Sequence, residues 1–325
     1  MKKILLVKTS SLGDVVHNLP VVSDIARRYP GARIDWVVEE GFAALPALHP
    51  AVTRVIPVAV RRWRKTPLGQ TTRREVGAVR KLFAAEPYDV VIDTQGLLKS
   101  ALIARSARGE CHGYNARSAR EPLAARLYDV THAVPRNLHA VMRNRMLVAA
   151  ALHYRLEDDV DYGIRAGPER DKGGGADTYC VLLHATSRAD KHWSEAHWSA
   201  LGACLAKAGL QCLLPWGSPA ESATAQRIAA TIPGARVAPR LDLAAMARLL
   251  AGARFTVGVD TGLTHLSAAL GRPTVAIFCA SSPALTGVFG AAAARNLGAP
   301  GAPPDVDAVL EVVAALAAIG PQGLA

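Results

Sequence analysis

The chain has 325 residues, of which 50% are hydrophobic and 20% are charged, so it is neither disordered nor fibrous. At roughly 100–200 residues per domain, this length predicts two domains. The five cysteines include no Cys-x-x-Cys pair, which argues against a disulfide framework and a structural zinc site. No apolar run reaches the roughly 18 residues of a membrane span, and Lys8 closes the N-terminal apolar stretch too early for a signal peptide. We therefore expect a cytoplasmic protein.

The net charge of +11 is concentrated in the first half of the chain. Residues 1–165 contain 26 Lys or Arg and 16 Asp or Glu, a net charge of +10, whereas residues 166–325 contain 12 and 11, a net charge of +1. The densest part holds four cations in five residues: Arg61, Arg62, Arg64 and Lys65. A basic surface confined to one half indicates a polyanionic partner such as a phosphate-rich lipid, a nucleic acid or an acidic sugar. The alternative is a solvated loop that binds nothing.

Short apolar runs alternate with helical patterns along the first half of the chain. Strands are expected at residues 4–7, 34–38, 55–60 and 90–93, with a weaker one near Cys111. Helices are expected at residues 15–28, 73–85, 98–108 and 137–152. This alternation predicts βαβ units and a parallel sheet, and the runs are apolar on both faces as a sheet covered by helices on each side requires.

The second half repeats the same pattern. Strands are expected at residues 180–184, 211–214, 255–259 and 274–278. Helices are expected at residues 195–207, 220–231, 243–251 and 263–270, and a last amphipathic helix at 304–318 is a candidate to pack back on the first domain. The sequence thus predicts a second parallel α/β sheet.

A glycine-rich, charged segment separates the halves. We place a linker at residues 166–177, between Rossmann-like domains at 1–165 and 178–325. Ligands of such sheets bind beyond the carboxyl ends of the strands. Two such domains facing each other would form a central cleft with a donor side and an acceptor side.

The first strand leads into a polar turn that contains Gly13 and Asp14. Gly13 permits a tight turn into the helix, and a carboxylate at Asp14 could accept a proton from a hydroxyl group. The alternative is that Asp14 only caps the helix, which is worth about 1 kcal/mol. The turn has neither the glycine fingerprint of nicotinamide-binding enzymes nor a P-loop, so a dehydrogenase is unsupported.

In the second half, the strand at 255–259 runs into Asp260, Thr261 and Gly262, where a helix begins at once. The free backbone N–H groups and the helix dipole there form an anion site suited to a diphosphate, which Gly262 lets approach closely. His265, one turn later, faces either a ligand or the helix packing, and a lone helical histidine is more often structural.

Two further strand ends carry candidate ligand groups. Thr186 and Ser187 offer hydroxyl donors, and Lys191 offers a mobile positive charge for an anionic leaving group, although it could be an ordinary surface lysine. Glu221 is placed to bind a ribose or sugar hydroxyl, or else to serve as an acid in the first turn of a helix. The histidines have no metal-ligand spacing, so no metal is predicted.

Taken in order, these segments resemble the ADP-heptose:lipopolysaccharide heptosyltransferases over nearly the whole chain. The motifs that carry the resemblance are Lys8-Thr-Ser-Ser-Leu-Gly-Asp14, Ile56-Pro-Val-Ala-Val-Arg-Arg-Trp-Arg-Lys65, Asp93-Thr-Gln-Gly-Leu-Leu-Lys-Ser100, Ala119-Arg-Glu-Pro-Leu123, Arg188-Ala-Asp-Lys-His-Trp193 and Val259-Asp-Thr-Gly-Leu-Thr-His265. The resemblance implies a GT-B glycosyltransferase fold and metal-independent, inverting transfer of L-glycero-D-manno-heptose from ADP-heptose to the Kdo of Kdo2-lipid A, with no cofactor.

The resemblance also assigns roles to residues. Asp14 would be the general base, and Lys191 would act on the leaving group. The donor would be held by Thr186, Ser187, Lys191, Glu221, Asp260, Thr261, Gly262 and His265. The acceptor would be held by Ser10, Gly13, Arg61, Arg62, Arg64, Lys65 and Arg120. Ser187 stands where relatives often have threonine, and the hydroxyl group is kept.

The implied setting is a monomer in peripheral contact with the cytoplasmic face of the inner membrane, with no nucleic acid bound. Two alternatives remain open. One is a related family member that uses a heptose acceptor with the same donor. The other is a polyanion-binding protein without enzymatic activity, which is disfavoured because nucleic-acid sites usually interleave aromatic residues and Trp63 is alone among the cations.

Overall fold

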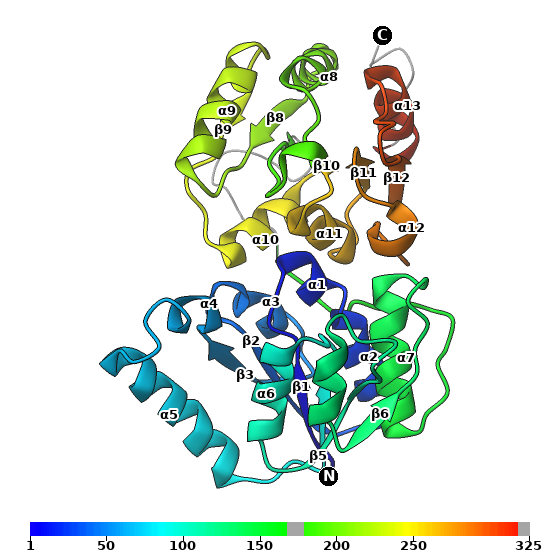
Figure 1. The fold of residues 1–325 in the computed structure, drawn as a ribbon. Coiled ribbons are helices and arrows are strands. Elements are labelled where there is room, and N and C mark those ends of the chain that lie inside the picture. The colour runs from blue at the N-terminus through cyan, green and yellow to red at the C-terminus, as the bar shows by residue number, and fades with distance from the viewer. Residues whose placement is uncertain (168–178, 318–325) are drawn as a thin grey trace. The chain divides into compact units, whose positions relative to one another are not determined.

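The computed structural model describes residues 1–167 and 179–317. It divides into two compact units, Met1–Ile164 and Arg165–Ala325, each built on a six-stranded parallel sheet (Figure 1). The predicted α/β class is therefore confirmed in both halves. The predicted linker falls largely on residues 168–178, which lie outside the described part of the chain.

The first sheet has the strand order β3-β2-β1-β4-β5-β6. Its strands are β1 (Lys3–Val7), β2 (Arg33–Glu39), β3 (Val52–Val58), β4 (Val90–Asp93), β5 (Glu110–Tyr114) and β6 (Val130–His132). The chain starts in the middle, builds one edge and then returns to build the other, so the order reverses between β1 and β4. Such a switch point opens a crevice beyond the carboxyl ends of these two strands, which is where ligands of open α/β sheets bind.

Helices cover both faces of this sheet. They are α1 (Leu12–Val16), α2 (Leu19–Arg28), η1 (Glu40–Phe42), α3 (Ala44–Ala47), α4 (Val60–Trp63), α5 (Gln70–Ala85), α6 (Leu98–Ser106), η2 (Pro122–Leu127) and α7 (Ala140–Leu152), where η marks a 3₁₀-helix. Helices α5, α6 and η2 share a hydrophobic core with Leu5 and Val7 of β1. Helices α2 and α7 pack against each other. Because both faces are covered, β1 and β4 are buried along most of their length.

Two local expectations in the first unit are wrong. The helix expected at 15–28 is two helices, α1 and α2, because Pro20 lacks a backbone N–H and fits only the first turn of a new helix. The strand expected at residues 55–60 ends at Val58, and the basic segment that follows begins in the short helix α4.

The second sheet has the order β12-β11-β10-β7-β8-β9, which repeats the topology of the first. Its strands are β7 (Tyr179–Leu183), β8 (Gln211–Leu214), β9 (Arg236–Val237), β10 (Thr256–Val259), β11 (Thr274–Phe278) and β12 (Ala294–Gly298). The order reverses between β7 and β10, and so the second switch point lies beyond the ends of these strands. Edge strands β9 and β12 were not expected, because neither carries a continuous apolar run.

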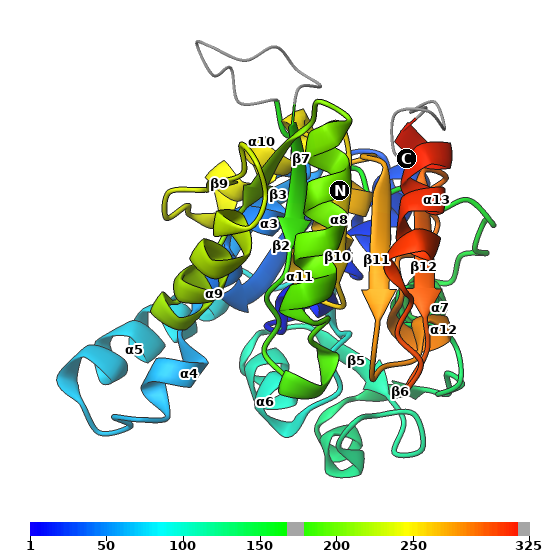
Figure 2. The same ribbon diagram turned by 90° about the horizontal axis from the view of Figure 1, so that it is seen from above.

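The helices of the second unit are η3 (Ala189–Lys191), α8 (Glu195–Lys207), α9 (Pro219–Ala230), α10 (Leu243–Gly252), α11 (Gly262–Ala269), α12 (Pro283–Thr286) and α13 (Val306–Ala317). Helices α8 and α13 lie side by side (Figure 2). Val309 and Val313 of α13 are buried in the core that α8 shares with β10 and β11. The last described helix thus packs within the second unit, and the expectation that it packs back on the first domain stays a prediction.

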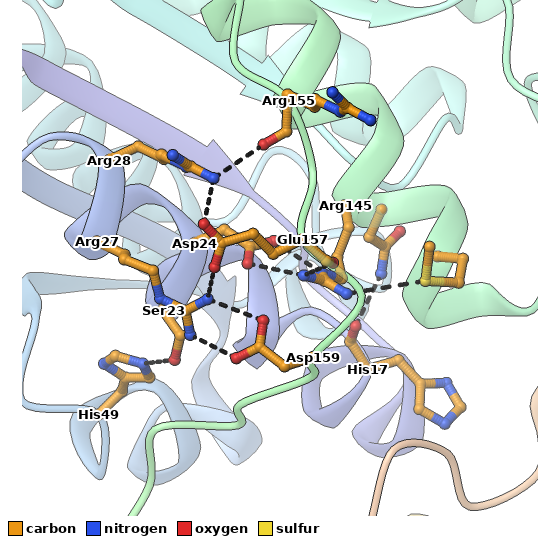
Figure 3. A network of polar contacts seen from close by, with 12 residues as sticks. His17, Ser23, Asp24, Arg27, Arg28, His49, Arg145, Arg155, Glu157 and Asp159 are labelled. Carbon is orange, nitrogen blue, oxygen red and sulfur yellow. Dashed lines mark hydrogen bonds and ion pairs between the residues drawn. The ribbon is translucent and has the colours of Figure 1, made fainter.

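A polar network fixes α7 to α2 in the first unit (Figure 3). The fully buried Arg145 of α7 donates two hydrogen bonds to the carboxylate of Asp24 in α2, at 2.8 and 2.9 Å. Arg145 also donates to the backbone oxygen of Glu157 at 3.0 Å. Arg27 binds both carboxylate oxygens of Asp159 at 3.0 Å, so the chain after α7 is held as well. This network sets the position of α7, whose first turns face the candidate site described below.

We expect Asp24→Asn to destabilise the first unit by about 3–5 kcal/mol, because it leaves the Arg145 guanidinium buried without a countercharge. Urea unfolding measures the change. The matched control is Asp159→Asn, which removes an exposed partner of Arg27 and should change stability far less, because water solvates both groups of that ion pair. Equal losses in the two variants would contradict this reading of the network.

Candidate active site

A polar pocket opens at the switch point of the first sheet. Lys8 follows β1 directly, and Thr94 and Gln95 follow β4, so both strands that flank the switch point contribute. The pocket is lined by Lys8, Asp14, Thr94, Gln95, Tyr114, Arg120, Ala140, Arg143 and Asn144. The candidate base and one predicted acceptor residue, Arg120, therefore meet in a single pocket.

Asp14 is the third residue of α1, and its carboxylate has two kinds of partner. One oxygen accepts hydrogen bonds from the backbone N–H and the hydroxyl of Ser11, at 2.9 and 3.0 Å, and so caps the helix. The other oxygen accepts from Arg120 at 2.7 Å. Burial raises the pKa of Asp14, but the charges of Lys8 and Arg120 and the Ser11 N–H outweigh it, so the pKa falls to about 2. Capping and placement in the pocket thus occur together.

Lys8 is the buried cation of the pocket. Its side chain donates to the backbone oxygen of Thr94 at 2.9 Å and to the side-chain oxygen of Asn144 at 3.3 Å, and the residue is only 4% exposed. Burial lowers the pKa of Lys8 to about 8, although the charge of Asp14 raises it. Sequence reasoning missed Lys8 as a site residue. Its signal was a lysine placed directly after a run of buried strand residues, where desolvation makes an unpaired charge costly.

The remaining walls add positive charge and hold the end of β1 in place. The guanidinium group of Arg143 lies over the ring of Tyr114, 5.1 Å from its centroid, and donates to the backbone oxygen of Ser118 at 2.6 Å. Gln95 accepts hydrogen bonds from both the N–H and the hydroxyl of Thr9, each at 2.7 Å. With Lys8, Arg120 and Arg143 around one carboxylate, the pocket suits an anionic ligand.

The structure brings only part of the predicted acceptor set together. Ser10, Gly13, Asp14 and Arg120 lie at the switch point, and the Ser10 hydroxyl accepts from Lys99 at 3.2 Å. The basic cluster Arg61, Arg62, Arg64 and Lys65 instead follows β3, the edge strand two positions from β1.

Part of the positive charge in that cluster is neutralised locally. Arg62 forms ion pairs with Glu40 and Glu75, at 3.0 and 3.1 Å. Arg64 and Lys65 are exposed. The number of cations in the sequence therefore overstates the charge that this segment offers a ligand.

The second unit has its own polar centre, again at a switch point. Thr186, after β7, donates its hydroxyl to the backbone oxygen of Asp260, after β10, at 3.2 Å. The Asp260 carboxylate accepts from Lys191 at 2.6 Å, from His265 at 3.4 Å and from the Ser281 hydroxyl. Burial raises the pKa of Asp260, but these three partners outweigh it and hold the pKa well below its usual range.

This arrangement revises the expected role of Lys191 and adds Ser281 to the centre. Lys191 was predicted to be a mobile charge, but its ammonium group is paired with Asp260, so an anion must share or displace that carboxylate. Ser281 was missed, although it follows β11 at the same edge of the sheet.

The other predicted donor residues lie around this centre. Thr261 and Gly262 start α11 directly after Asp260, as the sequence indicated. Glu221 is an acid in the first turn of α9, the second of the two roles considered for it. One of its carboxylate oxygens accepts hydrogen bonds from the backbone N–H groups of Gly217 and Ser218, at 2.7 and 3.2 Å, and so caps the helix. Ser187 is exposed.

Two parallel sheets of identical order, each with polar groups at its switch point, define a protein of the GT-B glycosyltransferase class, a fold shared with the solved heptosyltransferases. Residues 76–309 match the model of glycosyltransferase family 9 (heptosyltransferase). The chain therefore belongs to glycosyltransferase family 9.

Within this family, the chain is similar in sequence to proteins described as heptosyltransferase 1 and in structure to the heptosyltransferase WaaC. The sequence is 51% identical to lipopolysaccharide heptosyltransferase 1 of Pseudomonas aeruginosa over 89% of this chain and 81% of that protein. The structure of E. coli heptosyltransferase WaaC with ADP matches with a TM-score of 0.88 at 43% identity, over 97% of this chain and 99% of the other. The WaaC structure with ADP-2-deoxy-2-fluoro heptose matches with a TM-score of 0.85 at 43% identity, over 96% and 98% of the two chains. The resemblance that the sequence motifs indicated is confirmed.

We expect the buried Lys8 to make stability depend on pH. Its pKa is about 8 in the folded chain against an ordinary value of 10.5, so between these pH values the unfolded chain binds a proton that the folded chain does not. Stability should therefore rise with pH in this window, by up to about 3 kcal/mol relative to Lys8→Met. Urea unfolding of both proteins from pH 7 to pH 10.5 checks this. Parallel curves would show that Lys8 is not desolvated.

Proposed function

We propose that the protein transfers L-glycero-D-manno-heptose from ADP-heptose to the Kdo of Kdo2-lipid A, with inversion at the anomeric carbon and without a metal ion. The observation that carries this proposal is the first-unit pocket, in which one ionised carboxylate, Asp14, is surrounded by Lys8, Arg120 and Arg143. A carboxylate can accept the proton of an attacking hydroxyl group. The cations suit an acceptor sugar that is itself an acid.

The donor is assigned to the second unit. The backbone N–H groups at the start of α11 point out of the helix and can hold the diphosphate, and Gly262 permits close approach. Lys191 would exchange part of its contact with Asp260 for the diphosphate oxygens. In support, similar proteins at 43% identity have been solved with ADP and with an ADP-heptose analogue.

The reaction follows as one displacement. The acceptor hydroxyl oxygen attacks the anomeric carbon and forms the new glycosidic bond while the bond from that carbon to the diphosphate oxygen breaks. The electron pair leaves with ADP, whose charge is met by Lys191 and the N–H groups of α11. The hydroxyl proton goes to Asp14. With a pKa of about 2 this carboxylate is a weak base, so the proton moves only once bond formation has made the hydroxyl oxygen acidic.

Lys8 and Arg120 have a second consequence for Asp14. They keep the base ionised when substrate enters, and Arg120 must release or share the carboxylate for the acceptor hydroxyl to reach it. An acidic acceptor provides a reason for that release, because its own carboxylate can take over the guanidinium group. The pocket would thus become competent for catalysis only with an anionic acceptor in place.

We propose that the protein acts at the cytoplasmic face of the inner membrane, because the proposed acceptor is a lipid. Among the described residues, no helix combines the length and apolar character that crossing a bilayer needs. We propose peripheral contact with the membrane, through a surface of the chain.

The function is tested by turnover of ADP-heptose against two acceptors, Kdo2-lipid A and its heptosylated product, each with and without a chelator. We expect transfer to Kdo2-lipid A only, unchanged by the chelator. Transfer to the heptosylated lipid alone would instead support the second family activity, and loss of turnover with the chelator would contradict a metal-independent mechanism.

We expect Asp14→Asn to lower kcat roughly 10²–10⁴-fold, the usual contribution of a general base, while ADP affinity stays the same. The amide keeps an oxygen that can accept from Ser11, so the cap of α1 is largely retained. Steady-state kinetics and calorimetry with ADP measure the two effects. A variant that turns over at nearly the normal rate would remove Asp14 from the role of base.

The basic cluster should act on acceptor binding. We expect Arg61→Ala/Arg64→Ala to raise the acceptor KM roughly 30-fold with kcat and ADP affinity unchanged, because about 1 kcal/mol per cation is lost toward an anionic lipid. The control, Arg236→Ala/Arg248→Ala, removes two exposed arginines of the second unit and should leave the acceptor KM unchanged. An unchanged KM in the first variant would mean that the cluster does not bind the acceptor.

A further inference from the structure

Helices α6 and η2 expose three leucines on the first unit. Leu98, Leu102 and Leu123 are 37%, 60% and 54% exposed, respectively, and we call them the leucine patch. Leu98 and Leu102 are four residues apart and so lie on one face of α6. The backbone N–H of Leu98 donates to the Glu121 carboxylate at 2.6 Å, which joins the start of α6 to the residue before η2.

Each of the two helices also carries an arginine next to the leucine patch. Arg105 lies one turn beyond Leu102 on α6, and Arg126 lies three residues beyond Leu123 in η2, where three residues make one turn. Both arginines are exposed. Each helix therefore presents leucine followed by arginine along one face, which places apolar and cationic groups together on one exposed surface.

The leucine patch is adjacent to the candidate acceptor pocket. Lys99, next to Leu98, donates to the hydroxyl of Ser10 at the end of β1. Arg120, which immediately precedes Glu121, binds Asp14 in the pocket. The same two segments thus carry the leucine patch on their exposed side and contact the pocket through neighbouring residues.

We propose that the leucine patch is the surface through which the protein docks on an anionic phospholipid bilayer, with the leucines among the acyl chains and Arg105 and Arg126 at the phosphates. This proposal rests on the proposed function, because a lipid-linked acceptor has its sugar just above the bilayer surface. Burial of apolar side chains and attraction of cations to anionic lipids are the two terms that bind peripheral proteins. The net charge of +10 on residues 1–165 complements such a membrane.

Docking would bring the pocket to its substrate without extracting the lipid. The acceptor sugar would reach Asp14 and Arg120 while its acyl chains stay in the bilayer. The patch would then matter for an acceptor presented in a membrane and be irrelevant for the same sugar without its lipid, which separates docking from recognition of the sugar.

The test compares binding to vesicles of phosphatidylethanolamine with phosphatidylglycerol and to vesicles of phosphatidylcholine alone. The wild-type chain should bind the first and bind the second weakly, with an affinity that falls as salt rises. Leu102→Asn/Leu123→Asn should lower the affinity for anionic vesicles roughly a hundredfold, about tenfold for each leucine. The control is Leu285→Asn, an exposed leucine of α12 in the second unit, which should bind like wild type.

Turnover separates this proposal from the function on which it rests. With a water-soluble, delipidated Kdo acceptor, the leucine variant should match wild type, and with acceptor in vesicles it should be slower. Wild-type turnover on neither acceptor would refute the proposed function, whereas vesicle binding would still decide the docking surface. Vesicle binding that is unchanged in the leucine variant, or lost equally in Leu285→Asn, would overturn the proposal. So would a shift in oligomeric state caused by the leucine variant, which would mark the patch as a protein interface.

Discussion

The candidate site depends on one electrostatic constraint, a carboxylate held ionised between two cations at the end of β1. Lys8 ends the buried strand, and Asp14 lies six residues later in the first turn of α1, so the strand and the turn together fix their spacing. Burial disfavours the charged form of both groups. Burial alone raises the pKa of Asp14 and lowers the pKa of Lys8. The charges of Lys8 and Arg120 outweigh burial at Asp14, and the charge of Asp14 offsets part of the effect of burial at Lys8. The base and the anion-binding groups of the site are therefore the same interacting set.

The two units share one sheet topology and place similar charged groups at the same point in it. Each sheet reverses its order beside its first strand, and each places a lysine and an aspartate beyond that point: Lys8 and Asp14 in one unit, Lys191 and Asp260 in the other. Their surroundings differ in what they leave available. Asp260 is held by Lys191, His265 and Ser281, which suits a carboxylate that positions other groups. Asp14 gives one oxygen to the helix cap and the other to Arg120, an exposed side chain that can move. This contrast favours Asp14 as the group that reacts.

Much of the fold could be predicted from the sequence because the central strands are continuous apolar runs. The bounds of β4, β8 and β11 are those expected, since each is a short buried run between polar turns. Strand β12 was not expected because an edge strand tolerates Arg295 and Asn296, which break the pattern. At the site, sequence motifs identified Asp14 and Arg120 as candidate residues, but they did not predict the ion pair between them. Lys8 and Asn144 are 136 positions apart, and no local pattern states that a tertiary contact will bring them to one pocket.

The central claim is that Lys8 and Arg120 hold Asp14 ionised at the switch point. The most direct measurement is a carboxyl-detected ¹³C NMR titration of Asp14 in the wild-type chain and in Lys8→Met. The structure predicts a pKa of about 2 in the wild-type chain, and a clearly higher value in the variant, because burial then acts with one fewer opposing charge. An ordinary aspartate pKa, near 3.8 in both proteins, would contradict the account.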